Sequence, residues 1–351
     1  MPRSDQRRRA KIYIRGLLTA PGRKTISNIA SLPGGSEALR QSLTHLVSGS
    51  TWAWQPVRQA LALHVSQAAA PRAWVAQPLS IPKNGEHSAG VDPSPGTQQV
   101  LGIWLAGGIA SYPVSWRLFL SSAWLEDNAR KRAHIADWVK PQTRTGLLFD
   151  ALDEMTGTWN VPLRPVIIDS PALTEQPLVE GLTRRRLPFL IRISAATPLT
   201  SADPRTGLGS GPAPARKLAE GLKRLCRPTA WLSPADTVAR STFTMITPVT
   251  SPHAPGTPLV LVAEWNRLSQ EPSGLWLSSL TGAGPSQLLG LSRCPEQTTQ
   301  DFADVSSDTG ITDYEGRSFT GWHRHTTLAS IAHTIEMHSR EEPPRSGRRA
   351  A

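Results

Sequence analysis

Residues 165–193 read PVIIDSPALTEQPLVEGLTRRRLPFLIRI, a segment in which two apolar runs flank a helical pattern. A β-branched strand ends at Asp169, a helical pattern covers about residues 175–186, and residues 189–193 predict a second strand. Strands that alternate with helices in this way pair in parallel within layered α/β domains. The stretch therefore predicts one βαβ unit of such a domain.

Three further strands are predicted upstream, at residues 73–76, 100–105 and 114–120, each bounded by glycine, proline or polar residues. A helix is predicted at residues 145–155, between these strands and the βαβ unit. Consecutive strands followed by strands that alternate with helices indicate an α/β fold, with a mixed sheet flanked by helices.

The most apolar stretch, residues 100–125, raises the question of a membrane span. It contains Gly107, Gly108 and Pro113, and Arg117 interrupts it. This composition favours two buried strands joined at the glycine pair over a spanning helix. We therefore expect no membrane partner.

The composition of the rest of the chain predicts its domains and disordered segments. Residues 1–12 predict a basic, disordered arm, and residues 13–70 a small helical N-terminal domain suited to DNA binding. Residues 71–338 form the expected α/β domain, which a Pro/Ser/Thr/Gly-rich insertion interrupts at about residues 195–257. Residues 339–351 predict a disordered tail.

The charge and the cysteine content limit the partners and the cellular location that fit this sequence. The chain of 351 residues carries 38 Lys and Arg against 27 Asp and Glu, a net charge of +11, which favours a polyanionic partner such as nucleic acid. Cys226 and Cys294 form no CxxC pattern, so neither a zinc site nor a disulfide framework is expected, and a cytoplasmic location fits best. No GxGxxG, Walker A, GxSxG or HExxH string occurs, so dehydrogenases, nucleotide kinases and serine hydrolases have no support.

Four groups of residues resemble, in order and spacing, bacterial insertion-sequence transposases with a DDE endonuclease domain. They are Ala73-Trp-Val with Ile81-Pro-Lys83-Asn-Gly85-x-His87-Ser88, Tyr112-Pro-Val-Ser-Trp116-Arg117, Val166-Ile-Ile-Asp169, and Asp313-Tyr-Glu315-Gly316-Arg317-Ser318 with Gly321-Trp322-His323. The similarity runs from about Tyr13 to Met337. It implies an RNase H-like fold in which three acids hold two divalent cations, Mg²⁺ or Mn²⁺, for attack on a phosphodiester.

The resemblance also implies where those acids should stand. The family's first acid directly follows the Trp-Val strand, where this sequence has Gln77 and Pro78, and the second is retained as Asp169. Asp169 is thus the candidate catalytic and metal-binding residue.

The third acid is placed by counting back from Glu315 without gaps. It falls on Thr299, and the lysine that follows it in the family falls on Ser306. Glu296 precedes Thr299 by three residues and is the candidate for a displaced acid, because it could share a helix face with that position. If the fold is right, these positions lie close to Gln77 and Asp169.

Three hypotheses follow. The leading one is a DNA-binding protein of transposase origin that is catalytically impaired, needs no cofactor and associates with the nucleoid. The second is an active, metal-dependent transposase that uses Asp169 with Glu296. The third is a pseudogene product without a selected function. A homodimer is left open.

The candidate DNA contacts are basic residues in the resembling motifs or in the N-terminal helices: Arg15, Arg23, Lys24, Arg58, Lys83 and Arg317. A last helix, at residues 323–338, is rich in histidine but has no convergent cysteines or carboxylates, so a metal site is not expected there.

Overall fold

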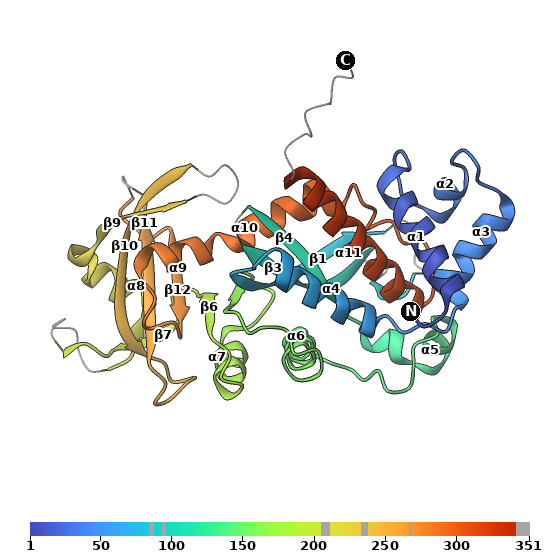
Figure 1. Ribbon diagram of the computed structural model, residues 1–351. Helices are drawn as coiled ribbons and strands as arrows, with labels where there is room; N and C mark the ends of the chain where they lie inside the picture. The colour runs from blue at the N-terminus through green and yellow to red at the C-terminus, as the bar shows by residue number, and fades with distance from the viewer. Residues whose placement is uncertain are drawn as a thin grey trace, which may run out of the picture.

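A computed structural model of the protein describes residues 1–83, 88–92, 96–107, 109–204, 211–232, 238–266 and 269–341. The molecule is elongated, with N-terminal helices at one end, a layered sheet in the middle and a β-rich lobe at the other end (Figure 1). Residues 84–87 of the Pro-Lys string and residues 342–351 of the predicted tail lie outside the described residues.

The described strands form one mixed sheet. They are β1 (Ala73–Pro82), β2 (Val91–Asp92), β3 (Thr97–Gly107), β4 (Ala110–Leu118), β5 (Val166–Ile168), β6 (Phe189–Arg192), β7 (Pro198–Ser201), β8 (Ala213–Pro214), β9 (Arg227–Leu232), β10 (Ala239–Thr250), β11 (Leu259–Trp265) and β12 (Gly274–Ser278). At its centre, β4, β3 and β1 pair antiparallel, while β5 and β6 continue parallel to β1. This arrangement confirms the predicted RNase H-like α/β fold and the reading of residues 100–125 as two buried strands.

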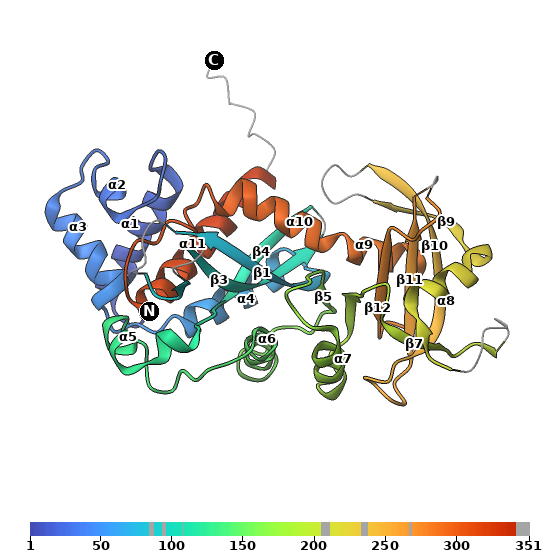
Figure 2. The same ribbon diagram turned by 180° about the vertical axis from the view of Figure 1, so that it is seen from behind.

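The helices cover both faces of this sheet. They are α1 (Ser4–Thr19), α2 (Ile26–Ala30), α3 (Glu37–Thr44), α4 (Gln55–Ala68), α5 (Asp127–Arg132), α6 (Arg144–Asp153), α7 (Glu175–Arg184), α8 (Ala215–Gly221), α9 (Pro285–Ser292), α10 (Cys294–Asp301) and α11 (Phe319–Glu341). One buried cluster joins α4, α6 and α7 to the sheet, and a second joins α9, α10 and α11 to its other face. Figure 2 shows α6 and α7 on one side of the central strands and α10 and α11 on the other.

Strands β7 to β12 extend the sheet beyond β6. The expected insertion at about residues 195–257 covers β7 to β10, and β11 and β12 follow it. Strand β12 pairs antiparallel with β6, and β11 and β10 continue the same sheet outward. Strands β11 and β12 are buried along their whole length.

The expected disordered arm at residues 1–12 is corrected by helix α1, which begins at Ser4. A stripe at three- and four-residue spacing is buried along it: Gln6, Ala10, Tyr13 and Leu17. The Tyr13 hydroxyl and His325 Nδ1 on α11 are 2.8 Å apart. The arginines between these buried positions make the segment look like a solvated arm when only its charge is considered.

Arg58 is also corrected, because this predicted DNA contact lies in the core. Its side chain is 1% exposed and donates hydrogen bonds to the Thr327 hydroxyl and the Trp116 carbonyl oxygen, both at 2.8 Å. It also donates to the His323 carbonyl oxygen at 3.1 Å. Arg58 therefore ties α4 to β4 and α11 and cannot reach a phosphate.

We predict that Arg58→Ala destabilises the fold by about 3 kcal/mol or more, because several buried acceptors lose their donor and a cavity is left. Exposed Arg15→Ala serves as the matched control and should shift the free energy of unfolding by less than about 0.5 kcal/mol. Denaturant unfolding of both variants measures this, and equal midpoints would contradict the assignment.

Two buried histidines of α11 are held neutral. His325 Nε2 lies 2.8 Å from the Gly310 carbonyl oxygen, and His333 Nε2 lies 2.8 Å from that of Ser111. A ring nitrogen facing a carbonyl must donate, so each Nδ1 accepts a hydrogen bond, from Tyr13 and Ser306 respectively. Burial lowers the pKa of both side chains to about 4.

Acid should therefore weaken the fold through these two rings. In the unfolded chain a histidine has a pKa of about 6.5, so below that pH the unfolded chain binds protons that the folded protein does not. The free energy of unfolding is therefore unaffected by these rings above about pH 6.5 and decreases as the pH falls towards 4. Each ring adds up to about 1.4 kcal/mol per pH unit to the slope. His325→Gln and His333→Gln should each flatten the dependence of the unfolding free energy on pH, whereas exposed His64→Gln should not.

Candidate functional site

The candidate site lies where β1 and β5 run side by side. Trp74 pairs with Val166 and Val75 with Ile167 in parallel, so the same register places Gln77 level with Asp169. Side chains alternate between the faces of a strand. Val75 and Ile167 belong to the buried cluster on the α10 face, so Gln77 and Asp169 lie on that face as well.

The two positions at which the resemblance implies acids, Gln77 and Thr299, are in contact. Gln77 Nε2 donates a hydrogen bond to the Thr299 hydroxyl of α10 at 2.8 Å, and that hydroxyl donates to the Pro295 carbonyl oxygen at 2.9 Å. The expected proximity of Gln77 and Thr299, more than two hundred residues apart in sequence, is thereby confirmed. Gln77 Oε1 is buried and has no hydrogen-bond partner among the described residues.

Asp169 has a cationic neighbour. Ile168 pairs in parallel with Ile191, so the next residues, Asp169 and Arg192, stand side by side at the ends of β5 and β6. Arg192 Nη1 lies 3.3 Å from Asp169 Oδ2, and the same guanidinium donates to the Ser273 carbonyl oxygen. An arginine is charged at all relevant pH values, so it offsets the single negative charge of this site.

The other predicted positions do not supply a third ligand. Glu296 is exposed on α10, one turn before Thr299, while Ser306 is buried and bonded to His333. Pro78 has no ionisable group and lines a small space with Leu101. Within the described residues, no three His, Cys, Asp or Glu side chains are grouped so that they could hold a metal ion.

An open cavity of about 580 Å³ adjoins Asp169 and includes Arg192, Glu175 and His253 in its lining. Glu175 is engaged there, because its carboxylate accepts from the Ser194 backbone N–H and from the Thr197 hydroxyl. It thus fixes the chain that leaves β6.

Comparison with known families adds to this geometry. The family model described as DDE superfamily endonuclease matches residues 1–249, which include Gln77 and Asp169. The chain belongs to this family. The match ends within β10, so the structure rather than the match places α10 and Thr299. No curated protein matches the chain, and no helix in the described part is long and apolar enough to cross a bilayer.

Enzymes of the DDE superfamily generally use divalent metals. A pair of such cations needs several anionic oxygen ligands. The three predicted acid positions offer one carboxylate, which is paired with Arg192, and one neutral amide oxygen, that of Gln77, while the nearby Glu175 is held by Ser194 and Thr197. These residues do not fit a two-metal centre.

The predicted DNA contacts separate into exposed and engaged side chains. Arg15 and Arg317 are exposed. Arg23 forms ion pairs with Asp313 and Glu315, and the Lys24 ammonium donates to the Ala20 carbonyl oxygen. Arg23 is exposed as well, but these two acids pair with its guanidinium, whereas no such ion pair holds Arg15 or Arg317 within the described residues.

Lys83 is corrected as a phosphate contact. Its ammonium donates to the carbonyl oxygens of Thr312 and Tyr314, and burial lowers its pKa to about 8. The side chain therefore holds the segment before α11 against the end of β1.

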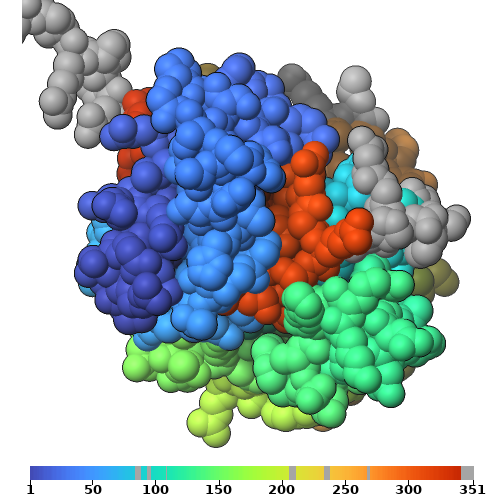
Figure 3. All heavy atoms as spheres, turned by 90° about the vertical axis from the view of Figure 1, so that its right-hand side faces the viewer, coloured from blue at the N-terminus to red at the C-terminus, as the bar shows by residue number. Residues whose placement is uncertain are grey.

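Arg317 belongs to a groove that the sequence did not reveal. The groove has a volume of about 650 Å³ and, in its described lining, carries three arginines, two histidines and no carboxylate. The basic residues are Arg40, which is ion-paired with Glu37, and His45, Arg132, His134 and Arg317. Figure 3 shows this end of the molecule, with the orange-red chain around residue 315 set between the blue N-terminal helices and green α5.

Arg192 and Arg132 were missed for different reasons. Arg192 ends a strand of the βαβ unit just as Asp169 does, so aligning the two strand ends would have found it. Arg132 meets Arg317 only through tertiary packing, and no local pattern marks it.

Acids placed at the positions of Gln77 and Thr299 should create a metal site with Asp169. We predict that the variant carrying Gln77→Asp, Thr299→Glu and Arg192→Gln unfolds at lower temperature without metal, because three carboxylates then repel one another. Mn²⁺ should reverse this loss, by about 2.7 kcal/mol at a hundredfold excess over the dissociation constant.

The control adds Asp169→Asn to the same variant and should lose the response to Mn²⁺. Thermal melts with and without Mn²⁺ provide the measurement. Equal stabilisation of the wild type by Mn²⁺ would refute the conclusion that its donor set does not fit.

Proposed function

We propose that this protein is a DNA-binding member of the DDE superfamily that has lost strand cleavage. The observation that carries the proposal is the hydrogen bond between Gln77 and Thr299, at two positions where the resemblance implies acids. The remaining acid position, Asp169, keeps its carboxylate, which is paired with Arg192. A site with this charge does not retain the metal ions that activate water or a 3′-hydroxyl.

Support for DNA as the partner comes from the family, from the net charge of +11 and from the basic groove. Arg132 and Arg317 are exposed, and they approach the groove from α5 and from the segment before α11. Exposed guanidinium groups bind phosphates through bidentate hydrogen bonds. The groove is therefore the surface that we assign to the DNA backbone.

The affinity for a DNA duplex should fall steeply with salt, with a log–log slope of about −0.9 for each phosphate neutralised. The double variant Arg132→Ala, Arg317→Ala should bind more weakly and make the slope shallower by about 2. The control is Arg184→Ala, an exposed arginine on α7. Fluorescence anisotropy of a labelled duplex over a salt series measures both quantities.

Two outcomes would count against the proposal. Affinity that is independent of salt, or absent, would remove DNA as the partner. Cleavage or joining of DNA with Mg²⁺ or Mn²⁺ that is lost in Asp169→Ala would instead establish an active enzyme.

A further inference from the structure

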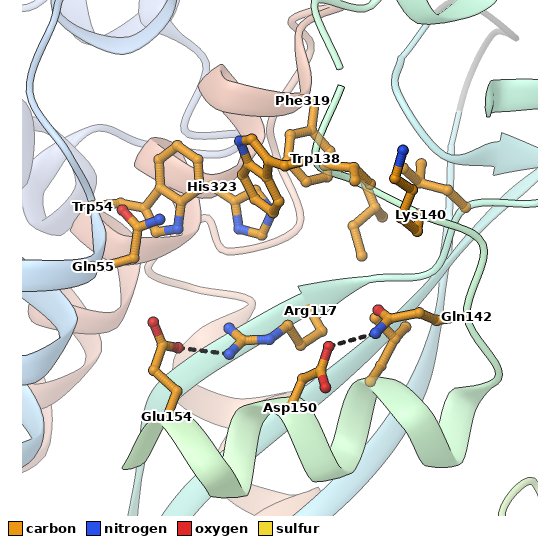
Figure 4. Close-up of a pocket in the computed structure, with 14 residues that line it drawn as sticks. Trp54, Gln55, Arg117, Trp138, Lys140, Gln142, Asp150, Glu154, Phe319 and His323 are labelled. Atoms are coloured by element: carbon orange, nitrogen blue, oxygen red, sulfur yellow. Dashed lines mark hydrogen bonds and ion pairs between the residues drawn. The ribbon is translucent and has the colours of Figure 1, made fainter. Parts of the chain in front are cut away.

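A second cavity lies next to the basic groove and is not part of the acid site. It has a volume of about 410 Å³, within the ~300–1,000 Å³ range of small-molecule sites. Trp54, Trp138, Phe319 and His323 contribute aromatic side chains to its lining (Figure 4). On the opposite side, Figure 4 shows polar side chains from β4, α6 and the segment that precedes α6.

The aromatic side is built around a stack. The rings of Trp54 and His323 are 4.7 Å apart and nearly parallel, and Phe319 meets His323 edge to face at 4.4 Å. Trp138 is 65% exposed, so its indole is available to a ligand. Large aromatic surfaces of this kind favour flat, unsaturated ligands.

The hydrogen-bonding groups are both donors and acceptors. Arg58 Nη2 donates to His323 Nδ1 at 3.3 Å, and burial lowers the pKa of His323, so the neutral ring carries its proton on Nε2. That Nε2–H remains as a donor on a side chain that lines the cavity. Gln55 adds an amide, and Asp150 a carboxylate with one oxygen beyond its bond to Gln142.

The charges of the lining cancel. Arg117 and Lys140 are balanced by Asp150 and Glu154, and Arg117 Nη2 lies 2.6 Å from Glu154 Oε2. A neutral lining disfavours a phosphate or another strongly charged group as the main occupant. Together with the aromatic wall, it favours a neutral, planar ring system with a hydrogen-bonding edge.

Two segments of the chain contribute residues to the lining of both the cavity and the groove. Arg317 and Ser318 line the groove, while the next residue, Phe319, lines the cavity. Likewise, His134 lines the groove and Trp138 the cavity. A nucleotide with its phosphate in the groove could thus present its base to the cavity.

We propose that this cavity binds a single purine or pyrimidine base. The base comes either from an unpaired nucleotide of DNA, in which case the inference rests on the proposed DNA binding, or from a free nucleoside. The aromatic wall stacks on the base, and the polar side reads its edge.

The test uses the full chain and three duplexes that differ at one position: an unpaired adenine, an abasic site, or a normal base pair. We expect the duplex with the unpaired adenine to bind about tenfold more tightly than the other two. Adenosine and thymidine, titrated by calorimetry, test the free-nucleoside source.

Variants of Trp138 link the effect to the cavity. Trp138→Ala should remove the tenfold preference, Trp138→Phe should keep most of it, and Leu232→Ala, 68% exposed in the β-rich lobe, should change nothing. Because Trp138 is largely exposed, its substitution should leave the melting temperature unchanged.

The outcomes separate the two proposals. Equal binding of all three duplexes without binding of either nucleoside overturns the base site and leaves DNA binding standing. Failure to bind any duplex overturns DNA binding, and adenosine binding that Trp138→Ala weakens would then support the base site for a free nucleoside. Absence of all binding overturns both.

Discussion

The parallel pairing of β1 with β5 is the constraint on which the candidate site depends. It joins residues about ninety positions apart and brings Gln77 level with Asp169, while the next pair, β5 with β6, brings Arg192 beside Asp169. Because side chains alternate along a strand, a shift of one residue in either pair would move these side chains to the opposite face. The buried residues of β1 and β5, which pack on both sides, hold that register.

The charges of Asp169 and Arg192 balance each other at this edge of the sheet. Three carboxylates held close together repel one another unless a cation is bound. Here, Gln77 Nε2 donates a hydrogen bond to the Thr299 hydroxyl, and Arg192 pairs with Asp169. The Asp169 carboxylate is thus balanced by a cation of the protein, while Gln77 Oε1 has no hydrogen-bond partner among the described residues.

Part of the positive charge of this protein lies in the core and does not face solvent. Arg58 and Arg324 are buried and donate to backbone carbonyl oxygens, so they hold the N-terminal helices against α11. Arg23 is paired with acids of the segment before α11. Part of the positive charge thus stabilises the fold, and the groove with Arg132 and Arg317 is where charge gathers without a carboxylate in the described lining.

The sequence by itself determined the mixed α/β fold, the position of Asp169 at a strand end and the family resemblance, because strand periodicity and short motifs are local properties. It did not find α1, Arg192 or the groove. The tertiary structure decided these points, and it also decided that Arg58 lies in the core and that Gln77 meets Thr299. Burial and pairing depend on which distant residues pack together, and a linear pattern of charge does not contain that information.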